Sequence, residues 1–149
     1  LAADFIRQMA RDVRVNHGAA AVLVPSSTVG QQAEAGLTQA GLKARFMRGA
    51  QLDLKSDDVK VLTLQAAKGL EFPVVVVAGL SAKQFPRLPA DMDPEERQEE
   101  LQTARRTLYV GLTRSMRRLL VLYARKQPSP LVTELADHFW DKVRQPVEG

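Results

Sequence analysis

Short continuous apolar runs alternate along the chain with segments in which apolar residues recur every three or four positions. Continuous runs are typical of strands buried on both faces, and the wider spacing is typical of helices that cover them. On these criteria we expect strands at residues 19–24, 43–47, 59–64, 73–78 and 119–123, and helices at residues 1–16, 29–40, from 93 to about 113–115, and 131–143. Strands that alternate with helices predict an α/β domain with a mainly parallel sheet.

A short polar segment separates the two most apolar runs of the chain. Its sequence is Gln-Ala-Ala-Lys-Gly at residues 65–69, and residues 66–72 have room for one helical turn. Because ligands of parallel sheets bind at the carboxyl ends of the strands, we expect residues 65–71 to lie at that edge of the sheet.

The side chains in and around this segment suit a nucleotide or a polynucleotide. Gly69 permits close approach of a ligand, and Lys68 carries a point charge suited to phosphate. Thr63 and Gln65 can hydrogen-bond to phosphate or sugar, and Glu71 can accept a hydrogen bond from a ribose hydroxyl. The same residues also fit a plain polar turn, and their pattern alone leaves both interpretations open.

The helix predicted from residue 93 leads to a second charged group. It begins with the favourable sequence Asp-Pro-Glu-Glu, and Arg114 lies where it should end. Its predicted core face consists of Leu101, Ala104, Leu108, Leu112 and Ser115. Arg114 can bond to the last helix carbonyls, or it can point its guanidinium at a nucleotide phosphate across an interface.

Composition limits the classes of function. A chain of 149 residues with 45% apolar content predicts one globular domain, and the formal net charge of +4 is compatible with acidic partners. Residues 105–126 carry seven basic side chains and no acid, which marks a candidate surface for polyanions. There is no cysteine, and the two histidines are far apart, so we expect no metal centre. No apolar run is long enough to cross a membrane, and we expect a cytoplasmic protein without a membrane partner.

The sequence contains no G-x-x-x-x-G-K-[ST] phosphate loop and no acidic cluster after a strand that would hold Mg²⁺. We therefore expect that this chain alone does not hydrolyse ATP. The sequence also starts at Leu1 rather than at methionine, so we expect it to be a piece of a longer protein.

Three segments resemble the UvrD/Rep-like superfamily 1 DNA helicases. Residues 63–72 (TLQAAKGLEF) are similar to motif V, residues 105–116 (RRTLYVGLTRSM) to motif VI, and residues 21–42 to the motif IV region. The resemblance implies a RecA-like three-layer αβα domain, the second or 2A motor domain, spanning residues 1–149. It implies a partner in the first, N-terminal RecA-like domain, which would hold most of the ATP and Mg²⁺, and a track for single-stranded DNA. DNA repair is among the roles that it suggests.

The resemblance also implies roles for individual residues. Arg114 is similar to the catalytic arginine that reaches the γ-phosphate, and Glu71 and Gly69 fall on the nucleotide side. Thr63, Gln65 and Lys68 fall in the part of motif V that meets DNA. The residues that would support the domain interface and the motif VI helix are Arg105, Arg106 and Tyr109.

The chain departs from the family pattern in three places. Pro25 takes the position expected for a second phosphate-binding arginine, so either Arg45 or Arg48 compensates or Arg114 acts alone. Gln65 replaces the usual motif V histidine. Only the polar residues 48–58 stand where many members insert a large 2B domain. Two functions stay open: a DNA helicase or translocase motor domain, and a helicase-like adaptor that binds nucleic acid or protein without motor activity.

Overall fold

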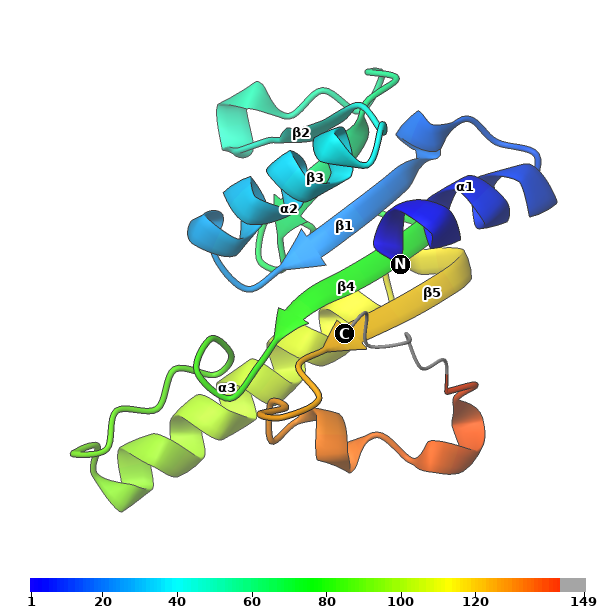
Figure 1. The fold of residues 1–149 in the computed structure, drawn as a ribbon. Helices are drawn as coiled ribbons and strands as arrows, with labels where there is room; N and C mark the ends of the chain where they lie inside the picture. Colours follow the sequence, from blue (N-terminus) through cyan, green and yellow to red (C-terminus); the bar gives the residue numbers. More distant parts are fainter. Residues whose placement is uncertain (143–149) are drawn as a thin grey trace.

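The computed structural model describes residues 1–142 and contains one five-stranded sheet (Figure 1). The strand order is β2-β3-β1-β4-β5, and every neighbouring pair is parallel. The strands are β1 (Ala20–Val24), β2 (Ala44–Phe46), β3 (Val59–Thr63), β4 (Phe72–Leu80) and β5 (Ser115–Tyr123). The predicted α/β class with a parallel sheet is confirmed.

Helices cover both faces of this sheet and make three layers (Figure 1). One core cluster joins α1 (Ala2–Asp12) and α2 (Ser27–Gln39) to one face through buried residues such as Ile6 and Leu37. A second cluster joins α3 (Pro94–Leu112) to the opposite face. Because both faces are covered, β1 and the centre of β4 are buried at every position, and this explains their uninterrupted apolar sequences.

The helix ends follow the capping residues that the sequence provides. Ser26 accepts a hydrogen bond from the backbone N–H of Val29 at 3.4 Å, and Asp93 accepts one from Glu95 at 2.8 Å. The predicted core face of α3 is correct for Ala104 and Leu108, which are both buried. Two strands are longer than predicted. β4 continues through residues 79–80, past the predicted end at residue 78, and β5 starts four residues before the predicted position 119.

The predicted C-terminal helix at residues 131–143 is wrong over the described residues. The chain forms two short 3₁₀ turns instead, Val132–Glu134 and Asp137–Phe139, and residue 143 lies outside the described part. Leu135 and Ala136 between the turns have extended ψ angles of 118° and 116°. The segment packs along the α3 face of the domain through the buried side chain of Leu131, so its apolar residues do not need a helical stripe.

Candidate functional site

Residues 64–71, which we call the crossing segment, connect two parallel strands that lie on either side of β1. At the end of β3, Thr63 pairs with Val24, the last residue of β1. Near the start of β4, Val74 pairs with Ala20, the first residue of β1. The crossing segment therefore runs from the carboxyl edge of the sheet to its amino edge, roughly 15–20 Å at about 3.3 Å per residue.

This course corrects the prediction that residues 65–71 all lie at the carboxyl edge. Only Thr63 and Gln65 lie there, while Glu71 lies at the amino edge, beside the start of β4. The predicted helical turn is a series of hydrogen-bonded turns without a helix. The N–H of Ala67 donates to the Thr63 carbonyl at 3.1 Å, and the N–H of Ala66 donates to the Thr63 hydroxyl at 3.2 Å.

The crossing segment is wedged between the sheet and α3. Its apolar residues Leu64 and Ala67 are fully buried in the cluster that contains the α3 side chains. Gly111 of α3 makes the close approach possible, because a Cβ there would lie 2.4 Å from a Leu64 methyl carbon. The apolar residues thus fix the position of the crossing segment against α3, and the polar residues at positions 65, 68 and 71 are exposed to solvent.

The backbone of the crossing segment turns at Gly69 toward the start of β4. Its φ of +82° lies in the left-handed region, which favours glycine, and a Cβ there would meet no atom within 4 Å. The surface beside Gly69 is therefore open, and the residue is needed for its backbone conformation. The predicted close approach of a ligand at this position remains a prediction.

Arg114 meets the far end of the crossing segment. Its carbonyl accepts a hydrogen bond from the N–H of Phe72 at 2.9 Å, which joins the end of α3 to the start of β4. Its guanidinium donates to the carbonyl of Val110 at 3.0 Å, to the Thr113 hydroxyl at 3.2 Å and, more weakly, to the carbonyl of Leu70 at 3.4 Å.

These contacts give Arg114 the helix-capping role that the sequence suggested, but all its partners are neutral. Among residues 1–142 no carboxylate lies within ion-pair distance of this guanidinium. A guanidinium has five N–H donors, so Arg114 keeps both positive charge and donor capacity for an anion. The structure brings Arg114 and Glu71 to the same edge, since Phe72 pairs with Ser115.

Residues 30–126 match the UvrD-like helicase C-terminal domain family. The chain belongs to this family. Over 88 residues it is 43% identical to the ATP-dependent DNA helicase PcrA of Leuconostoc citreum, a match that covers 52% of this chain and 11% of that protein. Over 104 residues it is 36% identical to DNA helicase II of Escherichia coli (strain K12), which covers 63% of this chain and 14% of that protein. The chain thus spans only a small part of these curated relatives.

The fold also matches a solved structure, the C-terminal domain of a possible DNA helicase from Lactobacillus plantarum WCFS1. The TM-score is 0.62 at 22% identity, and the match covers 91% of this chain and 73% of that one. The resemblance to UvrD-like helicases and the αβα fold that it implied are confirmed. In this UvrD-like domain the residues of motifs V and VI meet where Phe72 bonds to Arg114.

Pro25 and Arg114 do not lie together in this UvrD-like domain. Pro25 follows β1 at the carboxyl edge and contacts the region of Gly79 near the end of β4. Arg114 lies at the opposite, amino edge, beside the start of β4. Pro25 and Arg114 thus lie at opposite ends of the parallel strands.

Neither of the two arginines considered as replacements lies near Arg114. Arg45 and Arg48 lie on and after β2, the strand at the far edge of the sheet from β5. Arg45 pairs with Asp58 at 3.0 Å, and the guanidinium of Arg48 lies 5.4 Å from the centre of the Phe46 ring. Both therefore stabilise the β2 side of the domain.

The three predicted supporting residues of α3 differ in their surroundings. Arg105 makes a bidentate ion pair with Glu134, at 2.7 and 2.8 Å, and so ties α3 to the C-terminal segment. This pairing lowers the pKa of Glu134 and raises the pKa of Arg105, in both cases chiefly through the shared hydrogen bonds. Arg106 and Tyr109 are exposed, Tyr109 to 68%, which leaves them available to another domain.

Sequence reasoning missed Lys60, which is 1% exposed in the middle of β3. Its ammonium donates to the carbonyls of Gly18 at 2.6 Å and Asp58 at 3.2 Å, and to that of Ser56. Desolvation by burial lowers the pKa of Lys60, and the nearby Asp53 and Asp58 oppose this effect. A single lysine inside an apolar strand run was the available signal. The residue ties the short connection 48–58 to the sheet.

Over residues 1–142 there is no group of three or more metal-ligating side chains. No helix in that part of the chain is long and apolar enough to cross a membrane.

Proposed function

We propose that this chain is the second, C-terminal motor domain of an ATP-dependent DNA helicase or translocase. Membership of the UvrD-like family supports this role, and so do relatives named as ATP-dependent DNA helicases. The observation that carries the proposal is the course of the crossing segment, which joins two edges of the sheet that differ in their chemistry. One edge suits a nucleotide, and the other suits a polynucleotide.

The amino edge is the proposed nucleotide side. Arg114 stabilises negative charge on the transferred phosphoryl group, as a cationic donor aimed at that charge does in phosphoryl transfer. Its weak bond to the Leu70 carbonyl, at 3.4 Å, is easily exchanged for a phosphate oxygen. Glu71 accepts a hydrogen bond from the sugar, and the glycine at position 69 lets the nucleotide approach the backbone.

The carboxyl edge is the proposed DNA side. The Thr63 hydroxyl accepts a bond from Ala66, which leaves its O–H free to donate to a phosphate. Gln65 is exposed at this edge. Lys68 follows in the middle of the crossing segment, where it is exposed and where no acid among the described residues pairs with it. These groups suit contacts to the DNA backbone, which position a strand without reading its sequence.

The crossing segment provides the coupling between the two edges. It is short, it is anchored by Leu64 and Ala67 in the core, and its two ends are bonded to Thr63 and to Arg114. A shift of Arg114 toward a bound phosphate therefore displaces the same backbone that carries Gln65 and Lys68. Such a mechanical link is what a motor needs in order to convert domain closure into movement along DNA.

ATP with Mg²⁺ supplies the phosphoryl group in this proposal, and the described residues fit only one wall of such a site. Arg114 offers donors and unpaired charge to the phosphates, but the described part of the chain offers no cluster of carboxylates for the metal. The N-terminal RecA-like domain of the longer protein would hold the metal and most of the phosphates. That domain is the main partner that we propose, together with single-stranded DNA.

The adaptor alternative rests on Gln65, which replaces a histidine on the proposed DNA side, and on Pro25, which takes the position expected for a phosphate-binding arginine. The ATPase rate of the full-length protein, measured with and without single-stranded DNA, separates the two functions. A motor gives an ATPase rate that rises with DNA, while the 149-residue chain alone gives none. DNA binding by the full-length protein without any ATPase activity would support the adaptor and refute the motor.

A further inference from the structure

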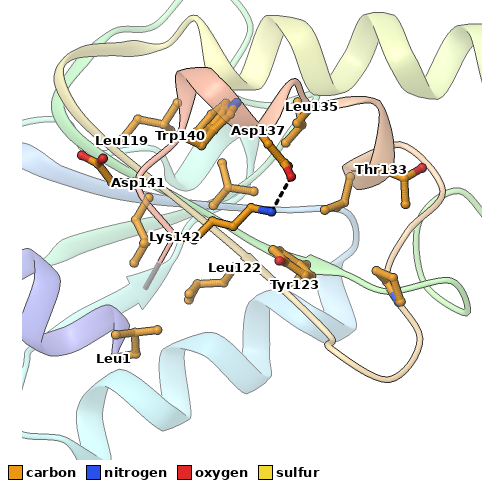
Figure 2. A pocket seen from close by; sticks show the side chains of 14 residues that line it. Leu1, Leu119, Leu122, Tyr123, Thr133, Leu135, Asp137, Trp140, Asp141 and Lys142 are labelled. Atoms are coloured by element: carbon orange, nitrogen blue, oxygen red, sulfur yellow. Dashed lines mark ion pairs between the residues drawn. The ribbon is translucent and has the colours of Figure 1, made fainter. Parts of the chain in front are cut away.

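A cavity of about 360 Å³ lies at the side of the sheet, between β5 and the C-terminal segment, residues 131–142 (Figure 2). Figure 2 shows Leu122 and Tyr123 of β5 on one side and Leu135 and Trp140 of the C-terminal segment on the other. Leu1, at the start of α1, contributes to the wall as well. The lining is mainly apolar, and the charged pair Asp137–Lys142, 2.7 Å apart, is neutralised within the wall.

The cavity runs along the side of β5 that has no neighbouring strand; we call this side the β5 edge. Five consecutive residues, 119–123, line it. Because successive strand residues point to opposite faces, a cavity lined by all five is bounded by the strand edge rather than by one face. Within the described part of the chain β5 pairs only with β4, so the N–H and C=O groups of its other edge have no strand partner. An edge of this kind accepts an added strand.

Both ends of this edge are strongly basic. Arg117 and Arg118 come just before the lining residues, and Arg125 and Lys126 come just after them. All four are exposed, and none forms an ion pair within residues 1–142. The wall of the cavity between these ends carries Asp137, Asp141 and Lys142, and because Lys142 pairs with Asp137, Asp141 is left as the uncompensated charge. The charge pattern is therefore positive at both ends and apolar to weakly acidic between them.

We propose that the β5 edge binds an extended peptide segment of a partner protein, with acidic residues at both ends and a neutral apolar centre. The peptide adds to the sheet through backbone hydrogen bonds, and its apolar side chains enter the cavity. Its acids pair with the two basic clusters. A polynucleotide fits less well, because its evenly spaced phosphates would face the apolar centre and Asp141.

A second copy of this chain fits less well too. Antiparallel pairing of two β5 edges would place Arg117 and Arg118 of one copy opposite Arg125 and Lys126 of the other. Like charges directly opposite each other destabilise such a pair. Charge repulsion thus disfavours self-association through the β5 edge, while the same basic residues attract an acidic partner.

The test uses the ¹⁵N-labelled 149-residue chain and two peptides that differ only in their ends. Each has alternating valine and threonine in the centre, with two glutamates at each end in one peptide and two lysines in the other. We expect the glutamate peptide to shift the amide resonances of residues 119–123 and to bind roughly tenfold or more tightly than the lysine peptide. Charge reversal by Arg125→Glu with Lys126→Glu should reduce or invert this preference.

A matched control carries the same number of reversed charges beside β2, at the other side of the sheet, Lys43→Glu with Lys55→Glu, and both of these residues are exposed. This control should keep the affinity of the native chain. Equal affinity for the two peptides would overturn the proposal, and so would shifts located outside β5. Displacement of the glutamate peptide by oligo(dT) at comparable affinity would indicate a DNA surface instead. Self-association of the native chain that shifts the amide resonances of residues 119–123 would indicate a dimer interface instead.

Discussion

Replacing Gly111 by alanine adds one methyl group to the contact between α3 and the crossing segment. The added Cβ would lie 2.4 Å from a Leu64 methyl carbon and 3.8 Å from one of Leu23. The best separation of two carbons is about 3.5–4.0 Å, so the first contact is too short by more than roughly 1 Å. Leu64 is 1% exposed and cannot turn into solvent, so either its side chain or α3 must shift.

We expect this overlap to lower the free energy of unfolding by about 1–3 kcal/mol, the usual cost of overpacking a core. Alanine favours a helix over glycine by about 1 kcal/mol, but Gly111 is the second-last residue of α3, where this gain is small. Gly36 near the end of α2 is the matched control, because a Cβ there meets nothing within 4 Å. Gly36→Ala should therefore stabilise the domain by about 0.5–1 kcal/mol.

Urea unfolding followed by circular dichroism measures both variants under identical conditions. The same chemical change should thus give opposite signs at the two positions. In the double variant Gly111→Ala with Leu64→Ala the overlap is removed, and the two changes should show a coupling of about 0.5–3 kcal/mol. If Gly111→Ala were as stable as Gly36→Ala, the close packing of α3 on the crossing segment would be refuted.

Three further predictions concern single contacts. Gly69→Ala should destabilise the domain by about 1–2 kcal/mol in the same urea assay, although space is free around it, because its φ is +82°; no loss would refute the left-handed turn. The pairing with Arg105 lowers the pKa of Glu134, so this pair stabilises the fold above the ordinary carboxyl pKa of 4.5 and loses its effect as the pH falls through the lowered pKa. The stability advantage of the native chain over Glu134→Gln should accordingly shrink in acid, and a constant difference would contradict this. In the full-length protein, Lys68→Ala should weaken single-stranded DNA binding and make its salt dependence shallower. The exposed control Lys83→Ala should change neither quantity. Equal salt slopes for the native and Lys68→Ala proteins would show that Lys68 serves only as part of a structural turn.

The apolar runs predicted the sheet well because every central strand is covered on both faces. The start of β5 was missed for the opposite reason: Arg117 and Arg118 lie in an edge strand and are exposed, so they break the apolar run. The helix predicted for residues 131–143 is wrong because Leu131 is apolar for another reason. It packs against the core, and this tertiary contact gave the same spacing of apolar residues as a helix would.

The site residues were found from their sequence motifs, but their arrangement was not. Parallel strands are usually joined by a dozen or more residues, often with a helix, but only eight residues join β3 to β4. The crossing depends on Gly111, which lets α3 approach Leu64, and on Gly69, which turns the chain. Neither the contact at Gly111 nor the turn at Gly69 produces a periodic pattern in the sequence. The sequence therefore could not indicate that Gln65 and Glu71 lie at opposite edges.

The central claim is that the two edges have separate tasks, with the nucleotide at the amino edge and DNA at the carboxyl edge. Steady-state ATPase kinetics of the full-length protein, with single-stranded DNA varied, test it most directly. Arg114→Ala should reduce kcat by roughly 10³-fold or more with little change in DNA affinity. Gln65→Ala should chiefly raise the DNA concentration needed for half-maximal stimulation, and the exposed control Arg97→Ala on α3 should change neither quantity. An unchanged kcat in Arg114→Ala, or equal effects of Arg114→Ala and Gln65→Ala on DNA affinity, would contradict the account.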